Sequence, residues 1–340
     1  MTVRFGLAGL SHFHASTIIE AMIERADVRV LALSEEDYAL RSANASKYGL
    51  KAYRNAFEMC DAEKPDAVAI VERPDRRADT AARLLSMGID VLLDKPAAVD
   101  RESLAKLAEA ARKGPGRLFP YFTVRYERPV AKALELIRSG AIGEVSSFTS
   151  MRPHKLLKGI RPGWFWGMPG DVIVDLGIHD IDIYRVACGF GPGERFTAFA
   201  SSGNFSGEGG EGFVDSAQFM LVPDNGPAGT FLADWLTPEG DPRHGDCAYF
   251  IAGTKGRIEV RSTGGIPGKG EALILTAGDR PPTFIEDGPA VPLDIFSDFL
   301  SRESGSEMAP GWEDMIIANG IALAAAKAAA SGEIARYTNY

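Results

Sequence analysis

The sequence predicts an α/β protein: a doubly wound parallel sheet followed by an α+β domain with a large, mostly antiparallel open sheet. Three observations predict this fold class. The chain has 340 residues, which favours two domains over one. In the first third, short apolar segments alternate with amphipathic helical segments, as in a parallel sheet covered on both faces. Later, strand-like segments follow one another across tight turns, which is typical of antiparallel pairing.

Residues 1–122 are interpreted as the first domain. The expected strands are 3–7, 28–33, 67–71, 91–93 and 118–122. The expected helices between them are 15–25, Tyr38–Tyr48, 76–87 and Arg101–Lys113. Gly49, Gly88 and Gly114 come directly after helical segments, where a left-handed residue commonly ends a helix.

Residues 123–340 form the expected second domain. The expected strands are 144–151, 213–222, 229–236, 249–251, 257–260 and 272–275. The expected helices are 129–139, 178–186, 292–300 and 312–330. Segment 201–212 is rich in glycine and serine and is expected to be a loop.

The composition excludes several classes of function. With a formal net charge of -9 and no basic segment, the chain is a poor candidate for binding nucleic acid or an anionic membrane. The three cysteines lie far apart, so we expect reduced thiols, a cytoplasmic location and no structural zinc. We see no secretory signal at the N-terminus and no apolar segment long enough to span a membrane.

Segment 6–14 follows the first expected strand and precedes the first expected helix, where a dinucleotide-binding turn belongs. Such a turn needs glycine for a tight bend and for close approach of the backbone to a diphosphate. Gly9 meets the first need, while the small residue Ser11 stands at the second position and His14 at the third. The expected cofactor contacts in this turn are Gly9, Ser11, His12, Phe13 and His14. The alternative is an ordinary turn in a fold that binds something else.

Glu35 ends the second expected strand, slightly more than 20 residues beyond the glycine turn. A carboxylate at this place accepts hydrogen bonds from the adenine ribose and repels a 2′-phosphate. We therefore expect Glu35 to bind cofactor and to favour NAD over NADP. The alternative is that Glu35 and the next two acidic residues only complement the dipole of the following helix.

Two more strand ends carry charged residues. The loop with Pro74 and Arg77 follows the strand 67–71 and is expected to pass the nicotinamide half of a bound cofactor. Asp94 and Lys95 follow the next strand, and Pro96 restricts the backbone there. Ligands bind at the carboxyl ends of strands in open α/β sheets, which makes these residues candidate cofactor contacts and Lys95 a catalytic candidate. The alternative is solvated charges at element ends.

Asp175 and His179 are four residues apart, so one helical face or turn could present both. A carboxylate beside an imidazole orients and tunes a general base. The alternative is a helix cap at Asp175 and a hydrogen-bonded, buried His179. No third ligand with suitable spacing is evident, so we expect no metal at these residues.

Taken together, these motifs resemble the Gfo/Idh/MocA family, which is named after glucose–fructose oxidoreductase, inositol dehydrogenase and rhizopine catabolism proteins. The resemblance rests on the glycine turn, Glu35, Pro74, the Asp94-Lys95-Pro96 motif and the Asp175-x-x-x-His179 motif. It extends to the segments 125–129 and 140–144 and so covers nearly the whole chain.

The resemblance implies an N-terminal Rossmann domain over 1–122 and a substrate-binding and oligomerisation domain over 123–340, with the last helix a candidate for packing back on the first domain. It implies that Lys95 hydrogen-bonds the reacting hydroxyl, that His179 takes its proton and that Asp175 positions both substrate and histidine.

Three features depart from the family pattern. Ser11 and His14 replace glycine-type residues of the turn, Arg77 stands where many members carry histidine, and Gly170-Asp171 stands where many have a run of glycines. Ser11 and His14 put the geometry of cofactor binding in question. The degenerate turn also motivates one alternative function, a non-catalytic Rossmann-type sensor of NAD or another ligand.

The resulting hypothesis is an NAD-dependent dehydrogenase or reductase acting on CH–OH groups of a sugar, polyol or sugar derivative, with NADP the less favoured cofactor. A second alternative is NAD-assisted hydrolysis or elimination on the same fold. The expected substrate contacts are Lys95, Arg125, Trp164, Asp175 and His179, with Arg161, Trp166, His154 and His244 as further candidates. We expect a homodimer or homotetramer formed through the C-terminal sheet.

Overall fold

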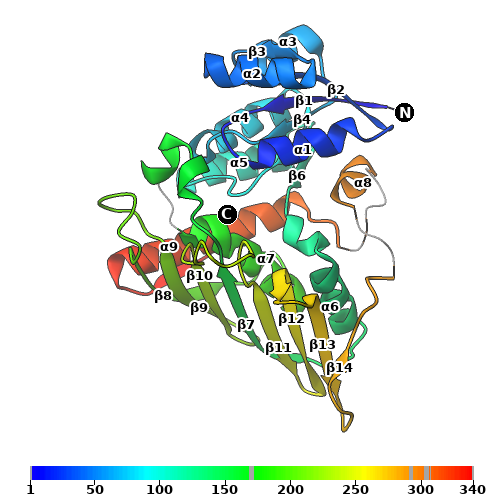
Figure 1. Ribbon diagram of the computed structural model, residues 1–340, viewed down its shortest axis with the longest axis vertical. Coiled ribbons are helices and arrows are strands. Elements are labelled where there is room, and N and C mark those ends of the chain that lie inside the picture. Colours follow the sequence, from blue (N-terminus) through cyan, green and yellow to red (C-terminus); the bar gives the residue numbers. More distant parts are fainter. Residues whose placement is uncertain (1, 168–171, 291–293, 302–305, 307, 339–340) are drawn as a thin grey trace. The chain divides into compact units, whose positions relative to one another are not determined.

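The computed structural model describes residues 2–167, 172–290, 294–301, 306 and 308–338. They fall into two compact units, each with its own sheet (Figure 1). The first unit comprises Met1–Tyr121, Pro162–Pro169 and Pro310–Ile316. The second comprises Phe122–Arg161, Gly170–Ala309 and Ile317–Tyr340. Two short segments from later in the sequence therefore belong to the unit that the first third of the chain builds.

The sheet of the first unit is parallel throughout the residues described, with the strand order β3-β2-β1-β4-β5-β6. Its strands are β1 Val3–Ala8, β2 Val28–Ser34, β3 Lys51–Tyr53, β4 Ala67–Ile70, β5 Asp90–Leu93 and β6 Leu118–Pro120. Every residue of β4 and β5 is buried, as expected for central strands covered on both faces. The order reverses between β1 and β4, which places a ligand-binding crevice at their carboxyl ends.

Three of the five helices described in this unit begin at a side chain that accepts from free backbone N–H groups. They are α1 His14–Ile23, α2 Tyr38–Tyr48, α3 Ala56–Glu63, α4 Pro74–Ser86 and α5 Arg101–Lys113. Asp37, Asn55 and Asp100 accept N-cap hydrogen bonds at α2, α3 and α5, and Pro74 occupies the first position of α4.

The sequence prediction omitted β3 and α3. The strand is only three residues long and two of its side chains are exposed, so its apolar pattern is too short to recognise. The signal for α3 is Asn55 followed three residues later by Glu58. Asn55 Oδ1 accepts from the backbone N–H of Phe57 and Glu58, and its amide donates to Glu58 Oε1.

The sheet of the second unit is mostly antiparallel, and for the described residues its order is β14-β13-β12-β11-β7-β10-β9-β8-β15. Only β10 and β7 pair in parallel. The strands are β7 Val145–Pro153, β8 Phe196–Gly203, β9 Ser216–Pro223, β10 Gly229–Asp234, β11 Ala248–Gly253, β12 Gly256–Ile266, β13 Gly270–Ala277, β14 Thr283–Phe284 and β15 Ala335–Tyr337. Together with the parallel sheet, this confirms the predicted fold class.

The helices of the second unit are α6 Arg128–Arg138, α7 Ile178–Cys188, α8 Ile295–Leu300 and α9, which spans Trp312–Ser331 and whose first residues belong to the first unit. Short helical turns cover Thr123–Tyr126, Lys158–Ile160 and, as a π-helix, Ile173–Gly177. A 3-10 turn at Gly163–Gly167 belongs to the first unit. Residues 292 and 293 of the expected helix 292–300 lie outside the described residues, and so do Gly170 and Asp171.

One expectation for this unit is wrong. The loop expected at 201–212 begins too early, because residues 201–203 complete β8 and pair with β9. This end of β8 is polar, so its sequence has no apolar pattern that would predict a strand, and β8 lies next to the edge of the sheet. The edge strands β14 and β15 also have no clear apolar pattern.

One face of this sheet packs against helices and the other is open. Helix α7 packs on β7, and α6 packs on β12 and β13 (Figure 1). An aromatic cluster of Phe148, Tyr184, Phe219 and Phe231 fills the covered face, with Phe219 and Phe231 stacked at 4.6 Å between ring centroids. Along β9, buried residues alternate with more accessible ones, which is the pattern of a sheet with one solvated face.

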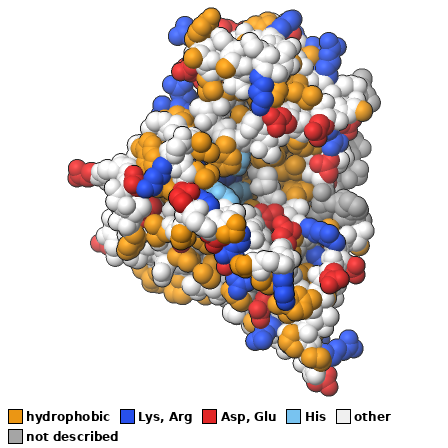
Figure 2. All heavy atoms as spheres, in the orientation of Figure 1, with side chains coloured by type: hydrophobic (Ala, Val, Ile, Leu, Met, Phe, Trp, Pro, Cys, Tyr) orange, Lys and Arg blue, Asp and Glu red, His pale blue; other side chains and the backbone are white. Residues whose placement is uncertain are grey.

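Among the described helices, none is both long and apolar enough to cross a membrane. Acidic and basic side chains are interspersed over the face of the molecule drawn in Figure 2.

Candidate cofactor pocket and catalytic residues

A pocket of about 620 Å³ lies in the first unit, at the carboxyl ends of β1, β2 and β4. Three of its lining residues were expected to bind cofactor: Gly9, Ser11 and Glu35. The others are Ser34, Glu36, Asp37, Ala39, Leu40, Arg54, Asn55, Glu72, Arg73, Arg76, Pro162, Gly163 and Trp164. Its size is in the range of cofactor and ligand sites.

Gly9 forms the bend that opens this pocket. Its backbone N–H donates to the carbonyl of Ser34 at 2.9 Å, and its φ is +90°, which an L side chain rarely adopts. A Cβ atom at this position would lie 2.4 Å from the backbone nitrogen of Glu72. The loops after β1 and β4 thus touch here, and only glycine fits between them.

Glu35 holds the turn and the rim of the pocket together. One carboxylate oxygen accepts from the backbone N–H of Leu10 at 2.8 Å, and the other accepts from that of Asp37 at 3.2 Å. The acidic residue predicted from the sequence therefore lines the pocket and also fixes the backbone of the glycine turn. Arginines also line the pocket, and Arg76 pairs with Glu36 at 2.6 Å.

Trp164 was expected to contact substrate, and the structure places it in the wall of this pocket. Its indole N–H donates to the hydroxyl of Ser11 at 3.0 Å. The segment around Pro162 and Gly163 lines the same wall. The serine that replaces a glycine of the turn therefore anchors a segment that comes from 150 residues further along the chain.

Some pocket residues were missed by the sequence analysis. Arg54 and Asn55 follow β3, the strand that was not predicted. The capping pattern from Asn55 to Glu58 could have located them, because it marks a helix start and hence another strand end at the same edge of the sheet.

Asp94 is a fully buried carboxylate with three cationic or imidazole neighbours. His14 Nδ1 lies 2.9 Å from one of its oxygens, and Arg77 donates to the other at 3.0 Å. His12 Nδ1 lies 3.7 Å from that second oxygen. Burial alone would raise the pKa of Asp94, but the nearby charges of His14 and Arg77 hold it well below its usual range.

Arg77 is also fully buried, and its guanidinium is used inside the unit. Besides Asp94 it donates to the carbonyls of Glu72 at 2.7 Å, of Pro96 at 3.1 Å and of Lys95. These contacts favour a structural role for Arg77, which fixes the backbone on both sides of Lys95. Of the other expected cofactor contacts, Phe13 is half exposed and Pro74 begins α4.

Lys95 follows β5 and is only 3% exposed. In the second unit, Asp175 lies in the π-helix and His179 in the first turn of α7; both are buried. Single π-helical turns are frequent at functional sites. His179 packs edge-on against Phe122, with 6.2 Å between ring centroids.

Two buried ion pairs hold the residues beside His179. Asp180 accepts from Arg152 at 2.8 Å and from the hydroxyl of Tyr249 at 2.8 Å. Asp182 forms a bidentate pair with Arg125 at 2.5 and 2.6 Å. Arg125, expected to contact substrate, is thereby engaged within the second unit and also donates to the carbonyl of Met308.

The other residues proposed as pocket lining in the second unit form a small cluster. The guanidinium of Arg161 lies over the ring of Trp235 at 5.6 Å, and the rings of His154 and His244 meet at 4.5 Å. Burial lowers the pKa of Arg161, and the charge of Asp175 opposes that shift. Burial, followed by the charge of Arg161, lowers the pKa of His244.

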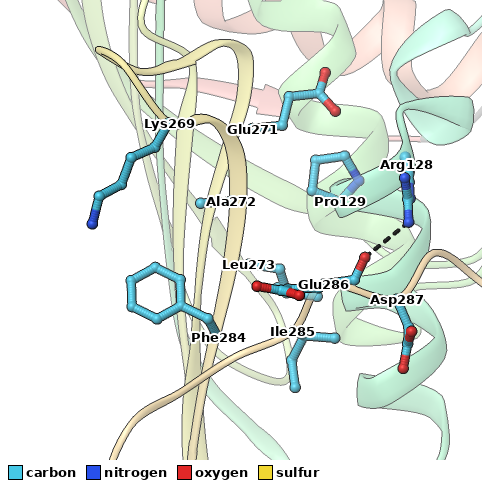
Figure 3. A pocket seen from close by; sticks show the side chains of 10 residues that line it. All are labelled: Arg128, Pro129, Lys269, Glu271, Ala272, Leu273, Phe284, Ile285, Glu286 and Asp287. Carbon is cyan, nitrogen blue, oxygen red and sulfur yellow. Dashed lines mark hydrogen bonds between the residues drawn. The ribbon is translucent and has the colours of Figure 1, made fainter.

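A second pocket of about 540 Å³ lies in the second unit between α6 and the strands β13 and β14. Figure 3 shows Arg128 and Pro129 of α6 on one side and Leu273 of β13 on the other, with Arg128 donating to the carbonyl of Glu286. None of the expected site residues lines it, so it does not bear on the catalytic assignment.

Comparison with known proteins places the chain in a family. Residues 3–122 match a model described as an oxidoreductase family with an NAD-binding Rossmann fold, and residues 130–259 match the Gfo/Idh/MocA C-terminal domain. The chain belongs to the Gfo/Idh/MocA oxidoreductases. This confirms the resemblance inferred from the sequence motifs, the assignment as an oxidoreductase and NAD as the cofactor of the family fold.

Two relatives show how far the sequence of this chain has diverged from other members of the family. The chain is 26% identical over 342 residues to inositol 2-dehydrogenase of Rhizobium meliloti strain 1021, covering 97% of this chain and 98% of that protein. It is 26% identical over 274 residues to the rhizopine catabolism protein MocA of Rhizobium meliloti, covering 81% and 82%. Among solved structures, a putative oxidoreductase from Erwinia carotovora atroseptica has a TM-score of 0.85 and 28% identity, covering 96% of this chain and 99% of that one.

The first unit fits the cofactor of its family. Gly9 leaves no room for a side chain at the bend, Ser11 is small, and a carboxylate stands at the end of β2, as dinucleotide binding requires. His14, at the third position of the turn, is directed to Asp94 by its hydrogen bond. The degenerate turn therefore keeps the bend and the acidic residue, and it has a histidine that hydrogen-bonds Asp94 at the third position.

Replacing Gly9 by alanine is expected to weaken NADH binding by at least about tenfold. The new Cβ would overlap the backbone of Glu72 and force apart the two loops that form the pocket. Fluorescence titration with NADH measures the loss. The matched control is Gly49→Ala, because Gly49 also has a positive φ of 65° but has open space around its Cβ position. Equal affinities of the Gly9→Ala variant and the wild type would contradict this account of the pocket.

Proposed function

We propose that the chain catalyses NAD-dependent transfer of hydride between nicotinamide and a hydroxyl or keto carbon of a sugar, polyol or sugar derivative. The observation that carries the proposal is the pocket of the first unit, with the Gly9 bend after β1 and Glu35 after β2. The proposal also draws on the relatives named inositol 2-dehydrogenase and rhizopine catabolism protein.

The turn of residues 9–14 would hold the diphosphate of NAD, and Glu35 the hydroxyls of its adenine ribose. The bound nicotinamide supplies the hydride chemistry. Trp164, tied to Ser11, closes the wall of the pocket on that side. The protein contributes position and the handling of the proton that leaves the substrate hydroxyl.

We assign three residues to the proton transfer. With NAD bound, the nicotinamide would accept the hydride of the carbinol carbon, and His179 would take the proton of the hydroxyl. Lys95 donates a hydrogen bond to the reacting oxygen as its charge builds up, and Asp175 orients the imidazole and the substrate. The burial of all three residues supports these roles, because burial holds each side chain in position and strengthens its electrostatic effect.

The second unit would bind the substrate. Aromatic and basic side chains gather in it: Phe213 stacks on Trp235 with 5.7 Å between centroids, and Arg161 lies over Trp235. Flat aromatic surfaces beside hydrogen-bonding groups suit the C–H faces and hydroxyls of a sugar or a cyclic polyol. Assays should begin with inositols and continue through sugar acids.

We propose that the chain forms homo-oligomers through the open sheet of the second unit. We also propose that it works in the cytoplasm. Phe199 of β8 and Met220 of β9 pair across the sheet and are 42% and 38% exposed. Apolar side chains side by side on an uncovered sheet face favour burial against another surface. All three cysteines are free thiols, as in a reducing compartment.

Lys95→Met and His179→Asn are each expected to lower kcat by about a hundredfold or more, the usual range for loss of a group that handles a proton. NADH affinity should change by less than about threefold, in the range expected when a side chain contributes to the reaction rather than to binding. Steady-state rates and NADH fluorescence titration measure the two effects. Lys106→Met is the control, because Lys106 is exposed in the same unit.

The double variant tests whether the two residues serve one reaction. If they act on the same transition state, the loss in Lys95→Met/His179→Asn is much smaller than the product of the single losses. Multiplicative losses would contradict the shared role. Wild-type kcat in either single variant would show that the substituted residue takes no part in proton transfer.

Turnover with catalytic NAD and no net NADH would instead show non-redox chemistry. A sensor would bind NADH without turnover of any polyol.

Glu35→Ala distinguishes two roles of that carboxylate. Loss of the ribose contact lowers the affinity for NAD and not for NADP, whereas deformation of the turn at Leu10 lowers both. We expect NAD affinity to fall by about tenfold or more and the NAD-to-NADP preference to shrink, as measured by titration with both reduced cofactors. Tight NADP binding in the wild type that Glu35→Ala leaves unchanged would contradict the ribose assignment.

Phe199→Asp/Met220→Asp is expected to convert the assembly to monomers, because it places charges in the proposed interface. Light scattering after gel filtration gives the mass of each species. Ile160→Asp is the control, because Ile160 is 68% exposed and lies outside the sheet. A monomeric wild-type protein, or an assembly that survives the double substitution, would rule out this interface.

A further inference from the structure

We propose that His12, His14 and Asp94 form a binding site for a divalent transition metal ion of the zinc type, at the turn between β1 and α1. The three side chains offer two imidazole nitrogens and one carboxylate oxygen, and these atoms all lie within 4.8 Å of one another. His12 and His14 are two residues apart in the sequence, and Asp94 follows β5, 80 residues after His14. The sequence analysis expected no metal and did not combine these residues.

The distances suit coordination after a small movement. Zinc binds nitrogen and oxygen at ~2.0–2.2 Å, so ligand atoms in a tetrahedral site lie ~3.3 Å apart. His14 Nδ1 lies 2.9 Å from Asp94 Oδ1, and His12 Nδ1 lies 3.7 Å from Asp94 Oδ2. The three ligand atoms lie within 4.8 Å of one another, so side-chain rotation must bring them closer. A bound ion would replace the hydrogen bond between His14 and Asp94.

The imidazole of His12 has the form that a ligand needs. The backbone N–H of His14 donates to His12 Nδ1 at 3.2 Å, so this nitrogen carries a lone pair and the proton is on Nε2. A bound ion would take this lone pair in place of the backbone hydrogen bond, and the ring would keep its proton on Nε2.

Ring contacts hold both imidazoles in place. His12 stacks on Phe13 and meets His14 edge-on, each with 4.4 Å between centroids, and His14 also meets Tyr121 at 6.2 Å. His12 is 6% exposed and His14 is 17% exposed, so an ion could reach the site from the side of His14. Sites whose ligands are already oriented lose less conformational entropy when the ion binds.

Arg77 fixes the carboxylate and also limits the affinity. Its bond to one oxygen of Asp94 leaves the other turned to His14, and ligating carboxylates are commonly held by such an outer hydrogen bond. The guanidinium charge opposes a cation, but it is also shared with three backbone carbonyls. One carboxylate and two neutral imidazoles leave much of the ion's charge uncompensated, so a fourth position would be taken by water or another oxygen.

The ligand set selects the kind of ion. Imidazole nitrogen suits Zn²⁺, Co²⁺, Ni²⁺ and Cu²⁺, whereas Mg²⁺ and Ca²⁺ prefer sites built of oxygen. The site lies within the turn proposed to hold the cofactor and next to Lys95, but the occupation by a metal ion is measured without cofactor and without turnover. Failure of this proposal would therefore leave the proposed oxidoreductase function untouched.

The test is a titration of the full-length protein, made without a histidine tag and stripped with a chelator, with Co²⁺ and then Zn²⁺. Calorimetry gives the stoichiometry, and the visible absorption of bound Co²⁺ reports nitrogen ligands in a low-coordinate site. We expect one ion per chain, displaced by Zn²⁺ and not by Mg²⁺. His14→Gln should weaken binding by about a hundredfold, because even loss of an outer partner of a ligand costs 10–100-fold.

His12→Gln gives a second variant at the same site, and circular dichroism with thermal unfolding checks that both variants remain folded. The control is His244→Gln, because His154 and His244 are the other closely placed histidines in the part of the chain described here. Unchanged binding in this control and loss in both site variants support the proposal. Absence of saturable binding up to millimolar Co²⁺, unchanged binding in both site variants, or loss only in the control would overturn it.

Discussion

The buried carboxylate of Asp94 is the constraint on which the functional edge of the first unit depends. A charge removed from water at this depth costs several kcal/mol unless partners compensate it, and here Arg77 and His14 do so. Those partners come from α4 and from the start of α1, so one carboxylate ties two helices to the end of β5. Loss of either partner leaves the buried carboxylate without full compensation in an apolar environment, and breaking such a pair typically lowers the free energy of unfolding by ~3–5 kcal/mol.

This constraint explains why the departures from the family pattern belong together. His14 stands where the turn usually has glycine, and Arg77 stands where many members have histidine, yet both bind Asp94. Arg77 in turn binds the carbonyls of Lys95 and Pro96. The unusual residues therefore form one connected arrangement, and it positions the backbone of the proposed catalytic lysine. A change at any one of the three should be tolerated poorly unless the others change with it.

The sequence analysis predicted the features that follow from hydrophobic periodicity and from the positions of strand ends. Both sheets, the Gly9 bend and Glu35 follow from apolar alternation and from the rule that parallel strands end at one edge. It omitted β3, whose three residues are too few for a pattern, and with it Arg54 and Asn55. It also treated Arg77 and Arg125 as charges facing a ligand, because unpaired arginines are seldom buried. Their partners, Asp94 and Asp182, are 17 and 57 residues away, and no local pattern joins such pairs.

At the start of α7, His179 lies close in sequence to two buried acidic residues. Asp180 and Asp182 are buried within three residues of His179, and their charges alone would favour a protonated ring. Arg152 neutralises the first and Arg125 the second, each through short hydrogen bonds inside the unit. Both of these acids are thus engaged by arginines, which leaves Asp175 as the carboxylate that we propose positions the imidazole. The proposed general base needs a neutral ring, because a histidine that is already protonated cannot accept the proton of a substrate hydroxyl.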